Sequence, residues 1–264
     1  MRLPRSNAGF TLVELIAVIV VLAITAVVGA GFIVDVVDQY QKAQLRSTLV
    51  QRGTVTLEQL TRKLRMSVPN SLRVSGSGQC IEYLPLIGGA FYTAELPDAD
   101  NGRPAIAAVP TIEFTIEQGA PSHVLVSPMN TTEIYTVATP SARIGAGDFG
   151  PAPYAQAVFS ANHVFNRNST SRRLLLAKDP ERFCLVGTTL VRYQGYGLDT
   201  SAINDASPAG VPVIMATGVT SDSNAFALSP GSEDRNAVID VSLRFSDRGE
   251  SVQLNSRVLI RNVP

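Results

Sequence analysis

The sequence contains few of the side chains from which catalytic and metal sites are usually built. It has two histidines and two cysteines among 264 residues. It also lacks Gly-x-Ser-x-Gly, His-Glu-x-x-His and phosphate-binding Gly-Lys-Ser/Thr elements. His123 and His163 do not stand in a metal-ligand spacing, so we interpret each as a hydrogen-bonded or solvated side chain. We expect neither an enzyme nor a resident metal ion.

The chain has no excess of charge of either sign. Lysine and arginine number 22, and aspartate and glutamate also number 22. Loss of residues 1–9, which hold Arg2 and Arg5, would leave two more acidic than basic side chains. Such a balance provides no strongly basic surface, so no nucleic-acid partner is expected.

The most prominent feature of the sequence is a long apolar run near its start. Glu14 is the only ionisable side chain between Phe10 and Val34. As a helix the run would extend about 37 Å, which is enough to cross a hydrocarbon core of about 30 Å. The run therefore predicts a membrane-spanning helix. Glu14 needs a compensating position or partner, because an ionised residue at the bilayer centre costs roughly 2.5 to 3.5 kcal/mol.

The residues at the head of this run resemble the processing signal of type IV prepilins and pseudopilins. A short basic leader is followed by Gly9, Phe10 and Thr11-Leu12-Val13-Glu14-Leu15. In that family a prepilin peptidase cuts after the glycine and methylates the new N-terminal residue, which the resemblance assigns to Gly9 and Phe10. The family's acidic residue at the fifth mature position pairs with the terminal amine of a neighbouring subunit. The resemblance therefore implies that Glu14 is an assembly residue.

An apolar run of this kind could also be a conventional signal peptide or a plain signal anchor. A conventional signal peptide would need a small-residue cut site, and Val28-Gly29-Ala30 offers one. A plain signal anchor would keep the Arg2 and Arg5 end in the cytoplasm, as a prepilin also would. The length of the run and its carboxylate favour the prepilin interpretation. The expected location is the bacterial inner membrane, with one spanning helix and the head in the periplasm, and later a pilus or pseudopilus.

The apolar pattern becomes one-sided after Val34. Apolar and small residues recur at steps of three and four up to Leu64, which predicts an amphipathic continuation of the helix to about Met66. Pro69-Asn70 would end it. Glycines are its expected weak points, at Gly29, Gly31 and Gly53. The predicted domains are a leader (1–9), a transmembrane or filament-core helix (10–34), its amphipathic continuation (35–68) and a periplasmic β-rich head (69–264).

Beyond Pro69 the periodicity is mostly two, which predicts strands. The clearest pair is Ala237–Phe245 with Glu250–Ile260, joined through Ser246–Gly249 as a hairpin. The fold class predicted is α+β, a long helix packed on an antiparallel sheet with inserted strands and loops. Turns are expected at Gly88-Gly89, 97–104, 140–153 and 199–207, and long loops around Val211–Met215 and Ala225–Leu228. The other expected strands are Ile81–Leu86, Thr111–Gln118, Ser122–Val126, Thr132–Val137, Ala155–Phe159, Arg172–Ala177, Arg182–Val186 and Thr189–Gly195.

The two cysteines would both face an oxidising periplasm. Cys80 and Cys184 are then most simply a disulfide, with buried free thiols as the alternative.

Three groups of residues resemble ligand sites without meeting their requirements. Gly145–Gly150 matches a dinucleotide fingerprint in letters, but Pro151-Ala152-Pro153 prevents the helix that such a site needs, so a loop is predicted. Asp98–Gly102 crowds oxygen atoms suited to calcium but lacks the third ligand and distal glutamate of an EF-hand loop, and a plain turn is the main interpretation. The same holds for Asp222, Asn224, Glu233 and Asp234. The aromatic residues Phe183, Tyr193 and Tyr196 are interpreted as packing.

Three later blocks resemble minor pilins of the mannose-sensitive haemagglutinin (MSHA) pilus. They are Cys80–Pro85, the run from Arg172 through Val186, and Val258–Pro264. A J-type minor pseudopilin of type II secretion is the alternative, and the large head suits it as well. A pilus-tip adhesin and an anchored periplasmic enzyme or binding domain are further alternatives. The resemblance implies four partners: prepilin peptidase, other major and minor pilins, the assembly platform and the inner membrane. No cofactor is expected, because the sequence carries none of the motifs that would bind one.

Overall fold

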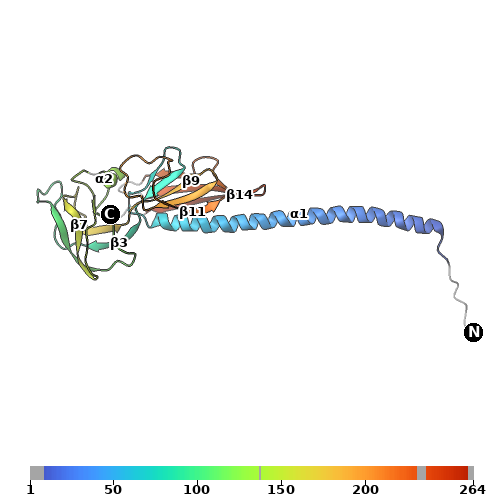
Figure 1. The fold of residues 1–264 in the computed structure, drawn as a ribbon, viewed down its shortest axis with the longest axis horizontal. Helices are drawn as coiled ribbons and strands as arrows, with labels where there is room; N and C mark the ends of the chain where they lie inside the picture. Colours follow the sequence, from blue (N-terminus) through green and yellow to red (C-terminus); the bar gives the residue numbers. More distant parts are fainter. Residues whose placement is uncertain (1–8, 137, 231–235, 261–264) are drawn as a thin grey trace, which may run out of the picture. The chain divides into compact units, whose positions relative to one another are not determined.

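The computed structural model describes residues 9–136, 138–230 and 236–260. It has an α+β fold, with one long helix, α1 (Leu12–Arg65), followed by antiparallel strands (Figure 1). The expected helix from Phe10 to Met66 is therefore confirmed, with slightly shorter ends. The chain divides into two compact units inside α1, between Thr48 and Leu49.

The second unit contains the last turns of α1 and all the strands. Its elements are β1 (Arg73–Val74), β2 (Cys80–Tyr83), β3 (Leu86–Phe91), β4 (Ile106–Phe114), β5 (His123–Leu125), α2 (Thr131–Tyr135), β6 (Arg143–Gly145), β7 (Tyr154–His163), β8 (Arg173–Ala177), β9 (Glu181–Val186), β10 (Thr189–Gln194), β11 (Val211–Thr217), β12 (Val219–Thr220), β13 (Phe226–Ser229), β14 (Ala237–Asp247) and β15 (Glu250–Ile260).

Two sheets form the part of the head that contains the end of α1. One has the strand order β1-β2-β9-β10-β11, and in the other β14 pairs with β15 and with both β12 and β13. The hairpin expected at Ser246–Gly249 is confirmed: Asp247 pairs with Glu250 across a two-residue turn. Arg248 and Gly249 both have positive φ, 45° and 84°, as a type I′ turn requires.

The core of this part lies between the helix and the sheets. Leu57, Leu60 and Leu64 of α1 are buried together with Phe226 and Phe245 of the second sheet. These leucines follow helical steps of three and four, so one face of α1 turns to the core. The amphipathic continuation of the helix is thus a packed core element from Leu49 onward.

The chain between β2 and β9 forms an inserted lobe with its own core. β2 and β9 are direct neighbours, and the segment that leaves one and returns to the other contains β3 to β8 and α2. A four-stranded sheet, β3-β8-β5-β6, packs with the pair β4-β7. Tyr92, Leu96 and Phe165 are among its buried side chains. The insertion expected from the sequence is therefore present.

Some local predictions were wrong. Thr132–Val137 was expected as a strand, but Thr131–Tyr135 is the short helix α2 because Asn130 caps it by accepting from the Glu133 backbone N–H. The strand expected over Ile81–Leu86 is divided at Leu84-Pro85, since proline has no N–H for the ladder. The strand expected at Thr111–Gln118 begins earlier and ends at Phe114, in β4.

Some segments that are rich in glycine or polar residues were expected as turns or loops but contain strands. Gly88-Gly89 lies inside β3, where a β-carbon on Gly89 would fall 3.0 Å from the Leu174 carbonyl oxygen. Residues 140–153 include the short strand β6. The segments expected to lie among long loops, Val211–Met215 and Ala225–Leu228, contribute to β11 and β13.

Candidate functional site

The Gly9–Phe10 peptide bond lies before the first turn of α1. Neither residue is helical, and Phe10 is 80% exposed. A β-carbon on Gly9 would meet nothing within 4 Å. Packing in this chain therefore gives no reason for a glycine at this place, and its small size is available for recognition by an enzyme. A peptide bond that is exposed and outside the helix is also one that a peptidase can bind.

Thr11 and Glu14 form the N-terminal cap of α1. The Glu14 backbone N–H donates to Thr11 Oγ1 at 3.3 Å, and the Thr11 hydroxyl is 3.5 Å from Glu14 Oε2. This Thr-x-x-Glu arrangement is the sequence of a capping box, and it places a carboxylate at the positive end of the helix dipole. Glu14 is exposed, so its carboxylate is also accessible to a positively charged group outside this helix.

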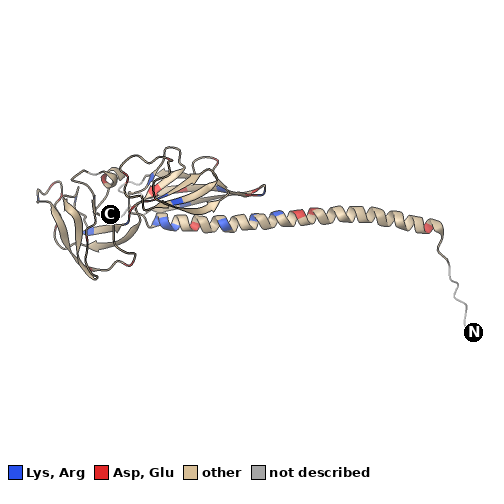
Figure 2. Ribbon diagram, in the orientation of Figure 1, with Lys and Arg blue, Asp and Glu red and all other residues tan. Residues whose placement is uncertain are grey.

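The helix after Glu14 presents an uninterrupted apolar surface. Figure 2 shows one acidic residue near its start and then a long stretch without charge before the aspartates that follow Val34. Large side chains on this stretch are exposed, such as Val13 at 75% and Phe32 at 69%. The Thr25 hydroxyl bonds to the carbonyls of Val21 and Leu22, so this polar group is satisfied inside the helix. α1 is long and apolar enough to span a membrane.

The structure pairs the two cysteines. Cys80 on β2 and Cys184 on β9 stand directly opposite each other and form a disulfide. Both are buried. The bond closes the chain at the base of the inserted lobe, since β2 leads into that lobe and β9 follows it. Of the two alternatives left by the sequence, the structure has the disulfide rather than free thiols.

In the candidate calcium loop, Asp98–Gly102, the Asp98 carboxylate already accepts hydrogen bonds from within the protein. Asp98 Oδ1 accepts the backbone N–H groups of Asp100 and Asn101, and Oδ2 accepts the Asn168 amide at 2.5 Å. These bonds lower the pKa of Asp98, against the opposing effect of desolvation. Among the described residues no group of three or more His, Cys, Asp or Glu side chains is placed to hold a metal.

The second group of oxygen-rich residues is only partly described. Asp222 is paired with Arg244. Glu233 and Asp234 lie outside the described residues. Residues 145–150 continue from β6 into a loop without a following helix, as the sequence predicted.

Both histidines are buried and hydrogen-bonded. His123 Nε2 is 3.1 Å from Asp179 Oδ1, and its Nδ1 faces the Arg143 guanidinium at 3.4 Å. His163 Nε2 is 3.1 Å from the Ser141 carbonyl oxygen. Burial is the main cause that lowers the pKa of each, and the neighbouring Arg143 lowers both further.

Sequence reasoning missed a cluster of buried charges around Glu82. Its carboxylate is fully buried and accepts from Arg73 Nε at 2.6 Å, Arg182 Nη2 at 2.8 Å and the Tyr196 hydroxyl at 2.8 Å. Arg73 and Arg182 are its cross-strand neighbours on β1 and β9. The two arginines also donate to the carbonyls of Asp199, Ser201 and Ala206, so the cluster fixes the loop after β10.

The aromatic residues flagged in the sequence lie in the packed interior. Phe183 stacks on Tyr83, with ring centroids 6.1 Å apart. Tyr193 is buried, with its hydroxyl 2.7 Å from Ser207 Oγ. Tyr196 belongs to the Glu82 cluster, and burial beside that carboxylate raises the pKa of its hydroxyl. The packing interpretation is therefore confirmed.

Comparison with known proteins identifies the start of the chain. Residues 4–30 match the model of the prokaryotic N-terminal methylation motif. No curated protein and no solved structure matches the chain. The matched residues include the Gly9–Phe10 bond, the Thr11–Glu14 cap and most of the apolar run. The chain thus carries the signal of a type IV pilin-like protein processed by prepilin peptidase, which supports its place in the pilin and pseudopilin family.

Proposed function

We propose that the chain is a minor type IV pilin similar to MshO of the MSHA pilus. It is cut after Gly9, methylated on Phe10, held in the inner membrane by its helix with the head in the periplasm, and then incorporated into a pilus or its tip. Its role there is structural, in initiating assembly, and it catalyses no reaction. Its partners are prepilin peptidase, other major and minor pilins and the assembly platform.

The observation that carries this proposal is the position of Glu14. It lies in the first turn of a helix whose following surface is apolar and exposed. In a plain anchor this carboxylate would serve only the helix cap, whereas a filament subunit can also pair it with the terminal amine of a neighbour. That pairing compensates for the desolvation of both charges as the helices leave the lipid and pack together.

The inserted lobe supports a minor rather than a repeated subunit. It adds β3 to β8 between two paired strands, with its own core. Such a large addition to every subunit would have to be accommodated all along a shaft, but a tip position leaves room for it. Two blocks that resemble MSHA minor pilins include β2 and β9, which are paired and joined by the disulfide.

The inserted lobe also suits the alternatives. A J-type minor pseudopilin of type II secretion would use the same processing and the same helix. A tip adhesin would add a ligand for the loops of the lobe. Deletion of the gene separates the pilus system from the secretion system, because it would remove pili in the first case and protein secretion in the second.

The test is Glu14→Ala in the full chain in its own membrane. We expect cleavage at Gly9–Phe10 to continue and pilus numbers to fall at least about tenfold, because the unpaired amine of a neighbour would be buried. Intact mass and N-terminal sequencing measure processing, and electron microscopy counts the filaments. Thr25→Ala, which changes a polar residue elsewhere in the same segment, serves as the matched control. Normal pilus numbers with Glu14→Ala would contradict the proposal.

A further inference from the structure

A furrow runs between the end of α1 and the edge strand β11. It consists of two adjoining hollows of about 720 and 590 Å³. Both hollows are lined by Arg62 and Lys63, and they reach the inserted lobe at Lys178. All of these residues belong to the second compact unit.

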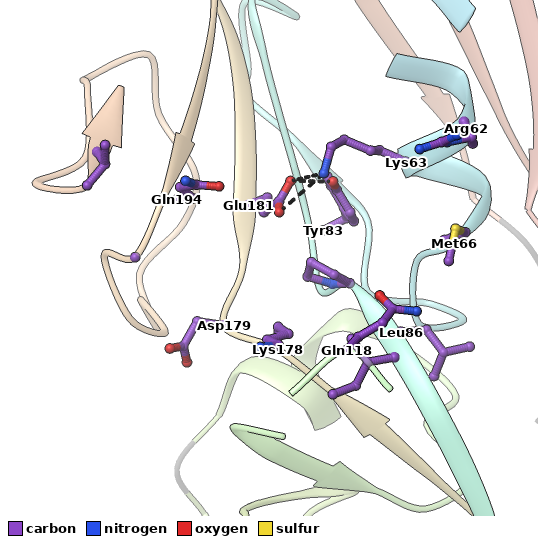
Figure 3. A pocket seen from close by; sticks show the side chains of 14 residues that line it. Arg62, Lys63, Met66, Tyr83, Leu86, Gln118, Lys178, Asp179, Glu181 and Gln194 are labelled. Carbon is purple, nitrogen blue, oxygen red and sulfur yellow. Dashed lines mark hydrogen bonds and ion pairs between the residues drawn. The ribbon is translucent and has the colours of Figure 1, made fainter. Parts of the chain in front are cut away.

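The polar centre of the furrow is Glu181, and its carboxylate already accepts hydrogen bonds from two side chains. Figure 3 shows Lys63 and Tyr83 directed at it, with Lys63 Nζ at 3.1 Å and the Tyr83 hydroxyl at 2.8 Å. Arg192 lies further away, with Nη1 3.8 Å from Glu181 Oε2. Glu181 therefore leaves Arg192 with a weak interaction only.

Arg192 is the least satisfied charged group in the furrow. Its side chain is 17% exposed, and its Nε atom is buried without a hydrogen-bond partner. A buried donor without an acceptor is destabilising, so an acceptor supplied by a partner would stabilise Arg192. Arg192 has only its weak pairing with Glu181, and Arg62 and Lys178 form no ion pair within the described residues. Three cations in the furrow are thus available to an acidic group.

The walls beside these cations are apolar. Ile214 and Val211 of β11 are 66% and 60% exposed. Val55 of α1 is 53% exposed, and Met66, directly after the helix, is 46% exposed. Apolar walls with a few cations suit a peptide that carries both apolar and acidic side chains. The acidic residues Glu58 and Asp179 in the same lining disfavour a polyphosphate or a nucleic acid.

The edge of β11 favours an extended peptide but offers only a short ladder. In the described part of the chain β11 pairs with β10 alone. Pro212 has no N–H to donate, and Arg52 occupies the side chain and carbonyl of Thr217. Backbone pairing is therefore confined to the stretch Val213–Ala216, and side-chain contacts must supply most of the affinity and specificity.

We propose that this furrow binds an extended acidic segment of a neighbouring pilin-like subunit, with a carboxylate placed against Arg192. The inference rests on the proposed function, because it takes the partner to be another subunit of the filament. It assigns a contact of the head to the side of α1 that holds Val55, Glu58 and Arg62. The segment lies beside β11 and adds acceptors for Arg192, Arg62 and Lys178.

The experiment places a photo-crosslinking amino acid at Ile214 in the full chain, in the membrane where it is normally made. We expect a crosslink to a pilin-like subunit, at a segment that contains aspartate or glutamate. Val186, which is 44% exposed on β9 and lines neither hollow, is the background position. Mass spectrometry identifies the partner and the crosslinked residue.

Charge reversal tests the chemistry of the contact. Arg62→Glu with Lys178→Glu should lower the crosslink yield at least about tenfold, and Arg192→Gln should lower it as well. Arg65→Glu is the matched control, since Arg65 is exposed on the same turn of α1 and lines neither hollow. Replacement of the partner's crosslinked acid by lysine should restore the yield with the reversed furrow.

Each outcome separates this inference from the proposed function. A processed chain with methylated Phe10 that enters filaments, but whose Ile214 crosslink is absent or insensitive to charge reversal, overturns the furrow contact and leaves the proposed function intact. A chain that is never processed overturns both. A crosslink that is lost equally with Arg65→Glu also contradicts the proposal, because the effect would then be one of general charge.

Discussion

Gly53 of α1 lies against Leu254 of β15 so closely that a side chain at residue 53 would have to displace the Leu254 side chain. A β-carbon on residue 53 would fall 2.3 Å from Leu254 Cδ1 and 3.0 Å from two ring atoms of Phe245. The sequence suggested Gly53 as a weak point of the helix. The structure instead makes it the position at which the helix approaches the second sheet.

Gly53→Leu should therefore destabilise the head although leucine is the better helix former. Overpacking of a close contact costs about 1–3 kcal/mol, which exceeds the helix-propensity gain of about 1 kcal/mol or less. Thermal or urea unfolding of the detergent-solubilised protein would measure the change. Thr54→Leu at the adjacent exposed helix position is the control, and an equal effect of both substitutions would show that close packing at Gly53 is not the cause.

Local patterns in the sequence predicted the elements whose signals are local. The helix followed from its apolar run and Pro69, and the β14–β15 hairpin from alternation around Asp247-Arg248-Gly249. Even the missed helix α2 had a local signal, because Asn130 and Glu133 have the spacing of a helix N-terminal cap. The two-residue periodicity at Thr132–Val137 favoured a strand, but the cap at Asn130 starts a helix there.

Local patterns could not predict the contacts between segments that are distant in the sequence. Glu82 and Tyr196 are separated by 114 residues, and nothing near either of them indicates the other. Gly53 and Leu254 meet for the same kind of reason, since only the packing of a helix on a sheet brings them together. At the candidate site the short motif Gly9–Glu14 could be predicted from the sequence because its residues are consecutive. The furrow could not be predicted from the sequence, because its lining comes from α1, β11 and the inserted lobe, which are far apart along the chain.

Removal of the disulfide should loosen the junction of the two parts of the head. Cys80 and Cys184 are separated by 104 residues, so the bond closes a long loop that includes the whole inserted lobe. Cys80→Ala with Cys184→Ala is expected to lower the free energy of unfolding by about 2–5 kcal/mol. Urea unfolding measures it, with the reduced wild-type chain as a second route to the same state. Unchanged midpoints in both would contradict this expectation.

Loss of the Glu82 carboxylate should be more damaging than loss of an exposed carboxylate. Glu82→Gln would leave Arg73 and Arg182 without their counter-charge in the interior, at an expected cost of about 3–5 kcal/mol. Asp240→Asn removes the partner of Arg257 at an exposed pair, where about 0.2–1 kcal/mol is expected. Unfolding of the two variants under one set of conditions provides the comparison. Similar small losses for both would mean that the buried cluster contributes little.

Mild acid should weaken the inserted lobe through its two histidines. Burial lowers the pKa of His123 and His163 below the ordinary value of 6.5, so the unfolded chain takes up protons before the folded chain does. Stability is then full above about pH 6.5 and falls as the pH decreases below it, by at most about 1.4 kcal/mol per pH unit for each histidine. Asp179 near His123 and the Ser141 carbonyl near His163 oppose this loss, and the positive charge of Arg143, which lowers the pKa of both histidines, reinforces it.

The slope of stability against pH is the decisive readout for the histidines, because substitution of a buried side chain also changes stability at every pH. His123→Gln with His163→Gln should flatten the curve between about pH 6.5 and 5. A separate loss at lower pH should remain, since hydrogen bonds lower the pKa of Glu133, Asp199 and Asp205 and hold these carboxylates ionised in the folded chain. Urea unfolding across this pH range measures both regions. A wild-type curve that is already flat above pH 5 would show that the two histidines are protonated equally in the folded and unfolded chain.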